Sequence, residues 1–106
     1  MLFLVRVKVR QPEQMSQKQL MQAWQREAEA ALGALKAGRV KGLYKVTGRR
    51  EAIAILDVSS HEELDRILEG LPIVRELGPW VRIDVTPIHP YESFYELIRK
   101  MASEAG

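Results

Sequence analysis

Apolar and polar residues alternate at the start of the chain. In "MLFLVRVKVR" the alternation begins at Phe3 and has the two-residue period of a strand with one buried face. The predicted core face carries four apolar residues, Phe3, Val5, Val7 and Val9. Similar patterns predict strands at 40–47, 52–58 and 80–88, and a tight turn at 48–51 joins the first two of these into a hairpin.

The helical period of 3.6 residues appears in three other segments. The ends of the first two are marked by typical capping and stop residues: Ser16 and Gly38 for the first helix, and Ser60, Glu63, Gly70 and Pro72 for the second. The third, at 91–103, is predicted to be an amphipathic C-terminal helix. Its apolar stripe is rich in aromatic residues and consists of Tyr91, Phe94, Tyr95, Ile98 and Met101.

The predicted element order is βαββαβ with an extra C-terminal helix, in one domain over residues 1–106. This order indicates an α+β fold of the ferredoxin-like kind, in which two helices cover one face of an antiparallel sheet. The other face is expected to carry Leu4, Leu43 and Leu56 beside Arg6 and Lys45, which is too apolar to remain exposed. We therefore predict a homodimer or a larger homo-oligomer with opposed sheet faces.

Composition narrows the possible partners. Sixteen basic and fourteen acidic residues give a net charge of +2, too weak a bias to indicate nucleic acid or a membrane. The absence of cysteine excludes disulfides and thiolate chemistry and fits a cytoplasmic protein. His61 and His89 have no ligand-spaced neighbours, so both are expected at the surface and no metal is predicted. The strand face with Arg6, Lys8 and Arg10 fits either a solvated or interface surface or a patch that attracts a small anion.

One residue breaks the pattern of the first helix. When residues 19–35 are wound at about 100° per residue, Glu27 falls inside the apolar stripe that should face the core. Burying a carboxylate is costly unless it is paired or protonated. Glu27 could therefore reach to the helix edge or pair with an arginine. Alternatively it could line an apolar pocket, where its pKa would rise toward neutrality, as a general base requires.

Two aromatic residues are candidate walls for such a pocket. Trp24 lies one helical turn before the carboxylate and would supply a flat apolar surface. If Val46 pairs with Ile53 in the hairpin, Tyr44 and Ile55 share a face, which we expect to be the helix-covered one. The other interpretation is that Tyr44 is an ordinary core residue.

Several stretches, in this order, resemble the muconolactone isomerase family. They are the opening "MLFLVRVKV", Pro12 and Met15, the helix that carries Glu27, "GLYKVTG", "ILDVSSHEEL", "GLPI" and "IDVTPI". The similarity runs without gaps from Met1 to about Pro72 and resumes at Ile83. No single stretch is specific, but their order and spacing are.

The resemblance implies a dimeric α/β barrel of ferredoxin-like protomers, which can assemble further into rings of dimers. It also implies an isomerase of aromatic catabolism that moves a proton within an unsaturated lactone, from muconolactone to the 3-oxoadipate enol-lactone, without metal or cofactor. Glu27 matches the family's acidic residue in the first helix and would be the base. Trp24, Tyr44, Lys45 and Arg49 are the candidate substrate-binding residues, and the last three could also donate to the enolate oxygen.

The chain departs from the family around this pocket. Family members tend to have tryptophan, arginine, histidine or asparagine where this chain has Val40, Tyr44, Lys45, Arg49 and Ala52. The segment after Pro72 is longer than in the family, and the C-terminal helix replaces a short tail. The lining and the rim of the pocket therefore differ.

Three hypotheses follow for the function. The first is a muconolactone isomerase-like enzyme that acts on a lactone or a related anionic molecule. The second is another cofactor-free enzyme of the same fold, such as a different isomerase or a monooxygenase. The third is a non-catalytic, oligomeric small-molecule-binding protein. An apolar cavity around Glu27 would favour the two enzymes, whereas an ion-paired Glu27 at the surface would favour the binding protein.

Overall fold

The structure is a computed structural model that describes residues 1–105. Its strands are β1 (Leu2–Val9), β2 (Val40–Lys45), β3 (Glu51–Asp57) and β4 (Val81–Ile88). Its helices are α1 (Gln17–Lys36), α2 (His61–Glu69), α3 (Pro72–Leu77) and α4 (Tyr91–Ala105), and a short 3₁₀ helix, η1 (Gly78–Trp80), precedes β4. The four predicted strands and the extra C-terminal helix are confirmed.

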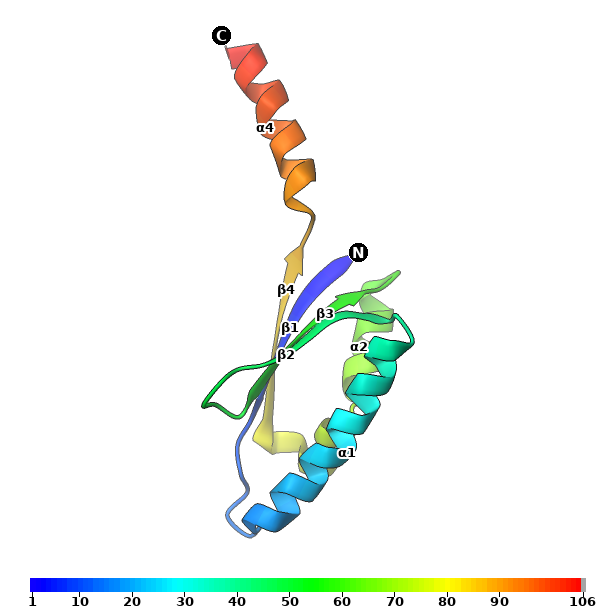
Figure 1. Ribbon diagram of the computed structural model, residues 1–106, viewed down its shortest axis with the longest axis vertical. Helices are drawn as coiled ribbons and strands as arrows, with labels where there is room; N and C mark the ends of the chain where they lie inside the picture. The colour runs from blue at the N-terminus through cyan, green and yellow to red at the C-terminus, as the bar shows by residue number, and fades with distance from the viewer. Residues whose placement is uncertain (106) are drawn as a thin grey trace.

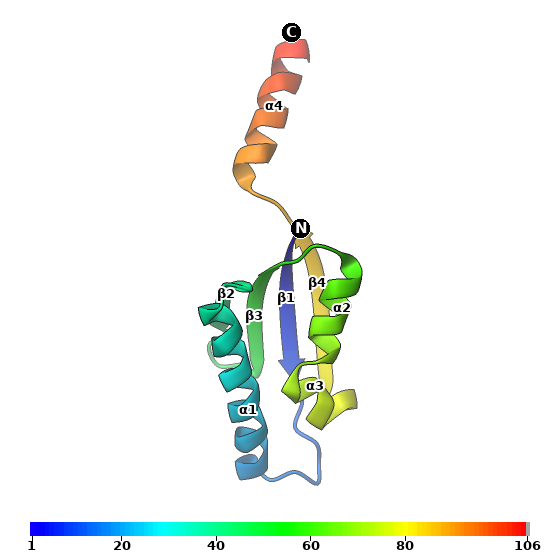
Figure 2. The same cartoon turned by 90° about the vertical axis from the view of Figure 1, so that its right-hand side faces the viewer.

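The four strands form one antiparallel sheet in the order β2-β3-β1-β4. Figure 2 shows α1, α2 and α3 in front of this sheet, and the edge-on view in Figure 1 shows that the helices lie on one side of it. The helix-covered face is the one that carries Phe3, Val5 and Val9 of β1. The open face carries Leu4, Arg6 and Lys8.

The core consists of two clusters between the sheet and the helices. In the first cluster, Phe3, Val5 and Leu56 of the sheet pack with Leu64 and Leu68 of α2. Complete burial of a side chain of this size stabilises the fold by about 1.5–3 kcal/mol. The predicted core face of β1 is therefore confirmed.

The second cluster joins α1 to α3. Leu20 and Ala23 of α1 pack with Ile73 and Leu77 of α3 and with Val9 at the end of β1. Leu20 and Ile73 are at most 1% exposed. This cluster fixes α3 against the first two turns of α1, and the candidate site lies one turn further along that helix.

The side chains of β2 face opposite directions from those expected. A bulge between Val40 and Gly42 adds one residue to β2, and one extra residue reverses which side chains point to the core beyond it. Leu43 and Lys45 therefore lie on the helix-covered face, while Tyr44 lies on the open face. The prediction that put Leu43 and Lys45 on the open face is wrong for this reason.

The expected hairpin register is also wrong, because Tyr44 rather than Val46 pairs with Ile53. Tyr44 and Ile55 do share a face, but it is the open one. Leu56 pairs with Phe3, so it lies on the helix-covered face and not on the open face as predicted. The open face instead combines the apolar residues Leu4, Tyr44, Ile53 and Ile55 with ion pairs that include Arg6–Glu51 and Lys8–Asp84.

The helix caps follow the predicted residues closely but not completely. Ser16 caps α1 with a full capping box to Gln19, and Gly38 follows the C-cap of α1 with a φ of +84°. Ser60 caps α2 by accepting a hydrogen bond from the Glu63 N–H, but the Glu63 carboxylate accepts from Ser59 instead of returning to Ser60. Only half of the capping box expected from Ser60 and Glu63 therefore forms.

α4 projects beyond the rest of the molecule along its long axis (Figure 1), and the extents of the molecule are 63 × 26 × 22 Å. All residues from 91 to 104 are exposed, including the aromatic residues of the predicted stripe. Within residues 1–105, no helix combines the length and the apolar character that a membrane crossing would need.

Candidate functional site

A cavity of about 420 Å³ lies between α1, the helix-covered face of the sheet and the α2–α3 connection. Its walls are mostly apolar. On the α1 side the wall is built from small residues, Ala28, Ala31 and Ala34, which leave space between the helix and the sheet. A small organic molecule of one ring fits a space of this size and character.

Glu27 of α1 lies in the wall of this cavity. It is half-buried, and its Oε1 accepts a hydrogen bond of 2.9 Å from the backbone N–H of Ile73, in the first turn of α3. Among residues 1–105 the carboxylate takes part in no ion pair. The predicted inward orientation is thus what the structure has, and the interpretation of Glu27 as an arginine-paired surface residue does not fit.

The surroundings raise the pKa of Glu27. Burial is the largest cause, because the apolar walls disfavour the ionised form. The hydrogen bond from Ile73 opposes this effect, and the negative charge of Glu76 adds to it. The carboxylate is therefore easier to protonate than an exposed glutamate, which suits a group that takes up and returns a proton.

The neighbouring arginine is occupied elsewhere. Arg26 points away from the cavity and pairs with Glu76 of α3, with distances of 2.9 and 3.1 Å from Nε to the two carboxylate oxygens. This bidentate contact links α1 to α3 beside the Glu27–Ile73 hydrogen bond. It explains why the adjacent arginine does not neutralise Glu27.

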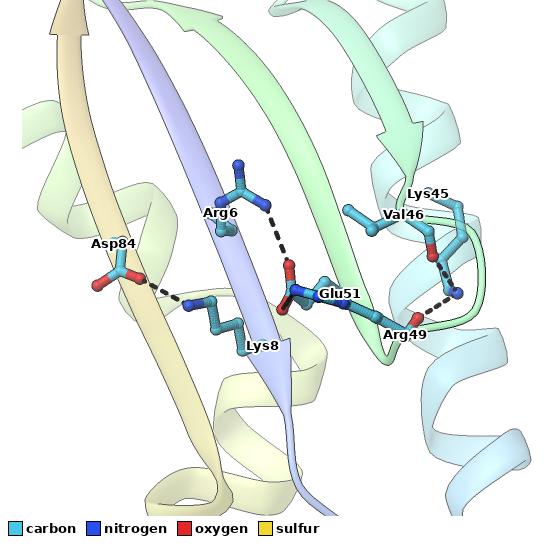
Figure 3. Close-up of polar contacts among 7 residues, drawn as sticks. All are labelled: Arg6, Lys8, Lys45, Val46, Arg49, Glu51 and Asp84. Carbon is cyan, nitrogen blue, oxygen red and sulfur yellow. Dashed lines mark hydrogen bonds and ion pairs between the residues drawn. The ribbon is translucent and has the colours of Figure 1, made fainter.

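Trp24 and Lys45 lie together in the same cavity wall. The Lys45 Nζ is 6.0 Å from the centroid of the Trp24 ring. Lys45 also donates hydrogen bonds to the backbone carbonyls of Val46, at 2.9 Å, and Arg49, as Figure 3 shows. These bonds hold a cation at the edge of an otherwise apolar space.

The other two predicted site residues lie differently. Tyr44 borders the cavity from β2, but it is 63% exposed because the bulge turns its side chain to the open face. Arg49 belongs to the turn after β2, its side chain is 72% exposed, and it is 3.9 Å from the Glu51 carboxylate. The structure therefore brings Glu27, Trp24 and Lys45 together and leaves Arg49 outside the cavity.

Sequence analysis missed the contribution of α3. Leu71, Pro72 and Ile73 line the cavity, and Ile73 supplies the backbone donor to Glu27. The second helix ends before Gly70 and Pro72, as predicted, but Pro72 also occupies the first position of the next helix, where proline is favoured because its missing N–H leaves no bond unmade. That dual role of proline was the available signal.

The family model for muconolactone delta-isomerase matches residues 1–93. The chain belongs to the muconolactone delta-isomerase family. The resemblance inferred from the sequence is confirmed.

Individual members of the family match over almost their whole length. The muconolactone delta-isomerase of Cupriavidus pinatubonensis is 39% identical over 92 residues, which are 85% of this chain and 96% of the relative. The one of Acinetobacter baylyi is 34% identical over 93 residues, 88% of this chain and 93% of the relative. The part of α4 after residue 93 lies outside the family match.

The fold agrees with that of a family member. A crystal structure of muconolactone isomerase at 3.3 Å resolution matches this structure with a TM-score of 0.69 and 30% sequence identity. The match covers 85% of this chain and 92% of the other. The chain therefore has the family's mixed α and β fold with its antiparallel sheet.

Proposed function

We propose that this protein is an isomerase that converts muconolactone, or a closely related unsaturated lactone, to the enol-lactone. The observation that carries the proposal is Glu27, a half-buried carboxylate without an ion pair in the wall of an apolar cavity. Membership of a family named for this reaction supports it. The cavity also favours an enzyme over the third hypothesis, a binding protein with a surface Glu27.

The reaction needs one base that can return its proton. Muconolactone has a ring double bond between C2 and C3, conjugated to the lactone carbonyl, and an acetate side chain on C4. Removal of the C4 proton by Glu27 sends the electrons of the C–H bond into the ring and gives a dienolate, with charge on the carbonyl oxygen. Glu27 then returns the proton to C2, which leaves the double bond between C3 and C4. The oxidation state does not change, so the reaction requires no redox cofactor.

Lys45 and Trp24 supply the other parts of this site. The Lys45 ammonium has three N–H donors, of which two serve backbone carbonyls. Its charge at the cavity edge stabilises the dienolate oxygen, and Trp24 provides a flat surface for the ring. Tyr44 contacts the substrate only at the rim of the cavity, whereas Arg49 lies outside the cavity, in the neighbouring cleft.

The protomer is of the ferredoxin-like kind, a single domain that pairs through its open face into a dimeric α/β barrel. The observation in favour is the apolar part of the open face, formed by Leu4, Tyr44, Ile53 and Ile55. The cations on the same face, Arg6 and Lys8, are paired with the carboxylates of Glu51 and Asp84. A role in the cytoplasmic breakdown of aromatic compounds agrees with the lactone substrate.

The test is isomerisation of muconolactone in D₂O, followed by NMR. We expect the enol-lactone to form at a rate that depends on protein concentration, with C2 carrying hydrogen from the C4 position or from solvent. Absence of turnover at high protein concentration would contradict the proposed reaction. The second hypothesis, another cofactor-free enzyme of this fold, would then remain for the Glu27 cavity.

A further inference from the structure

A second cleft lies beside the Glu27 cavity, between the end of β1 and the turn that joins β2 to β3. It is lined by five cationic side chains and one carboxylate: Lys8, Arg10, Lys45, Arg49 and Arg50, with Glu51. The positive charge therefore greatly exceeds the negative charge in this cleft. Such an arrangement attracts small anions.

The carboxylates nearby offset only part of this charge. Glu51 is bound by Arg6, at 3.0 Å, and lies 3.9 Å from Arg49. Lys8 pairs with Asp84 at 3.5 Å. Figure 3 shows these contacts on β1, β3 and β4, beside Lys45 at the end of β2.

The remaining three cations have uncharged partners within residues 1–105. Arg10 lies 5.0 Å from the centroid of the Trp80 ring, and Arg50 donates a hydrogen bond of 3.2 Å to the Gln17 side chain. Lys45 donates to backbone carbonyls. Their charges are therefore available to an anion that enters the cleft.

The cleft and the Glu27 cavity are neighbours that share two lining residues. Val9 and Lys45 line both of them. A molecule with its ring in the apolar cavity can thus place a side group in the cationic cleft, past Lys45. In this arrangement the apolar ring of the substrate lies in the Glu27 cavity, and its anionic arm lies in the cleft.

We propose that the cleft formed by Arg10, Arg49 and Arg50 binds the carboxylate arm of the lactone substrate and selects for ring lactones that carry an acid. The assignment of the ring to the Glu27 cavity rests on the proposed function. The cationic cleft itself is defined by its charges and its contact with the cavity. Arg10 and Arg50 are binding residues in this proposal and take no part in proton transfer.

The experiment measures binding of two unreactive probes by calorimetry. The first is the saturated lactone acid, 5-oxotetrahydrofuran-2-acetate, which lacks the double bond and cannot isomerise. The second is its carboxamide, which has nearly the same shape and no charge. We expect the parent protein to bind the acid about tenfold more tightly than the amide, and this preference to weaken as salt is added.

Variants of single arginines test which side chains cause the preference for the acid. Arg10→Gln and Arg50→Gln should each lower the affinity for the acid by about three- to tenfold and leave the affinity for the amide unchanged. Arg39→Gln is the matched control, because Arg39 is exposed, precedes β2 at the end away from the turn, and does not line the cleft. It should change neither affinity.

Equal affinity for acid and amide, no measurable binding of the acid, or an equal loss in the Arg39 variant would overturn the proposal. These outcomes are separate from the assay of isomerisation. A protein that isomerises muconolactone but does not prefer the acid probe retains the proposed function and loses the cleft. A protein that prefers the acid probe through Arg10 and Arg50 but does not isomerise muconolactone retains the cleft and loses the proposed function.

Discussion

At the scale of single residues, the feature that matters most is the environment of Glu27. Burial raises its pKa, whereas the hydrogen bond from Ile73 lowers it, and burial is the larger cause. The hydrogen bond also fixes Oε1, so that the other oxygen, Oε2, is the one free to face a ligand. The carboxylate is thus both oriented and poised for proton exchange.

This pKa shift predicts the pH dependence of catalysis. The base must be ionised to take the C4 proton, so kcat/KM should fall as pH falls through the raised pKa of Glu27 in the free enzyme. We expect the acid limb above the range of an exposed glutamate. A profile that stays flat down to that ordinary range would show that Glu27 is not the titrating base.

The same shift predicts how stability depends on pH. A carboxyl whose pKa is raised by folding favours the folded state while it is protonated, and this contribution is lost as pH rises through the folded pKa. The free energy of unfolding of Glu27→Gln should therefore rise relative to that of the parent as pH rises from the ordinary pKa of a glutamate through the raised pKa of Glu27, because the amide has no charge to bury. Chemical denaturation at several pH values measures this difference. A difference that stays constant, or that favours the parent as pH rises, would contradict the burial of the charge.

At the scale of elements, α1 presents two different surfaces. Its cavity side carries alanines, which create space next to the sheet, while its other side is exposed. Gly33 is on the exposed part in the last half of the helix, and a Cβ added there would meet no atom within 4 Å.

Gly33→Ala should therefore stabilise the protein by about 0.5–1 kcal/mol, because glycine loses more backbone entropy in a helix than alanine does. Thermal denaturation measures the change, and the isomerisation rate should stay the same. A lower midpoint would mean that another subunit packs closely against Gly33.

Some features of the strands and helices could be predicted from the sequence alone. Three such features are the strand alternation, the Ser16 cap and the inward position of Glu27. Each could be predicted because it depends on residues that are close in sequence. The faces of β2 were not predicted correctly, because a single bulge at Val40–Gly42 reverses the alternation, and the glycine inside the strand was its one sign in the sequence.

The site was predictable only in part, for a similar reason. Trp24 and Glu27 lie one turn apart on α1, so their proximity follows from the geometry of the helix. The contacts of Glu27 with Ile73 and of Lys45 with the cavity depend on the position of α3 and on the hairpin register. Those are set by long-range packing. Arg49 was placed in the site by family resemblance, and the structure instead puts it in the neighbouring cleft.

At the scale of the whole molecule, α4 is the unusual element. It extends from the body with Phe94, Tyr95 and Ile98 exposed, and the family match ends at residue 93. An apolar stripe of this kind normally packs against something. We expect it to pack on a second copy of the chain, where burial of Phe94 and Ile98 would contribute about 1.5–3 kcal/mol each.

Deletion of all residues after Pro90 should therefore weaken self-association and lower the thermal midpoint. Light scattering and thermal denaturation measure the two effects. Phe94→Gln combined with Ile98→Gln should act in the same direction, and Lys100→Gln, on the other side of the helix, is the matched control. Unchanged size and midpoint after the deletion would show that α4 is dispensable for assembly.

The central claim is that Glu27 transfers the proton, and the most direct measurement is the rate of muconolactone isomerisation by Glu27→Gln. The amide keeps the shape and can still accept the Ile73 hydrogen bond, but it cannot act as the base. We predict a fall in kcat of about 10²–10⁴-fold with the fold intact. The control is Glu29→Gln, an exposed carboxylate on the other side of the same helix, which should keep the parent rate. A Glu27→Gln protein that isomerises muconolactone as fast as the parent would contradict the claim.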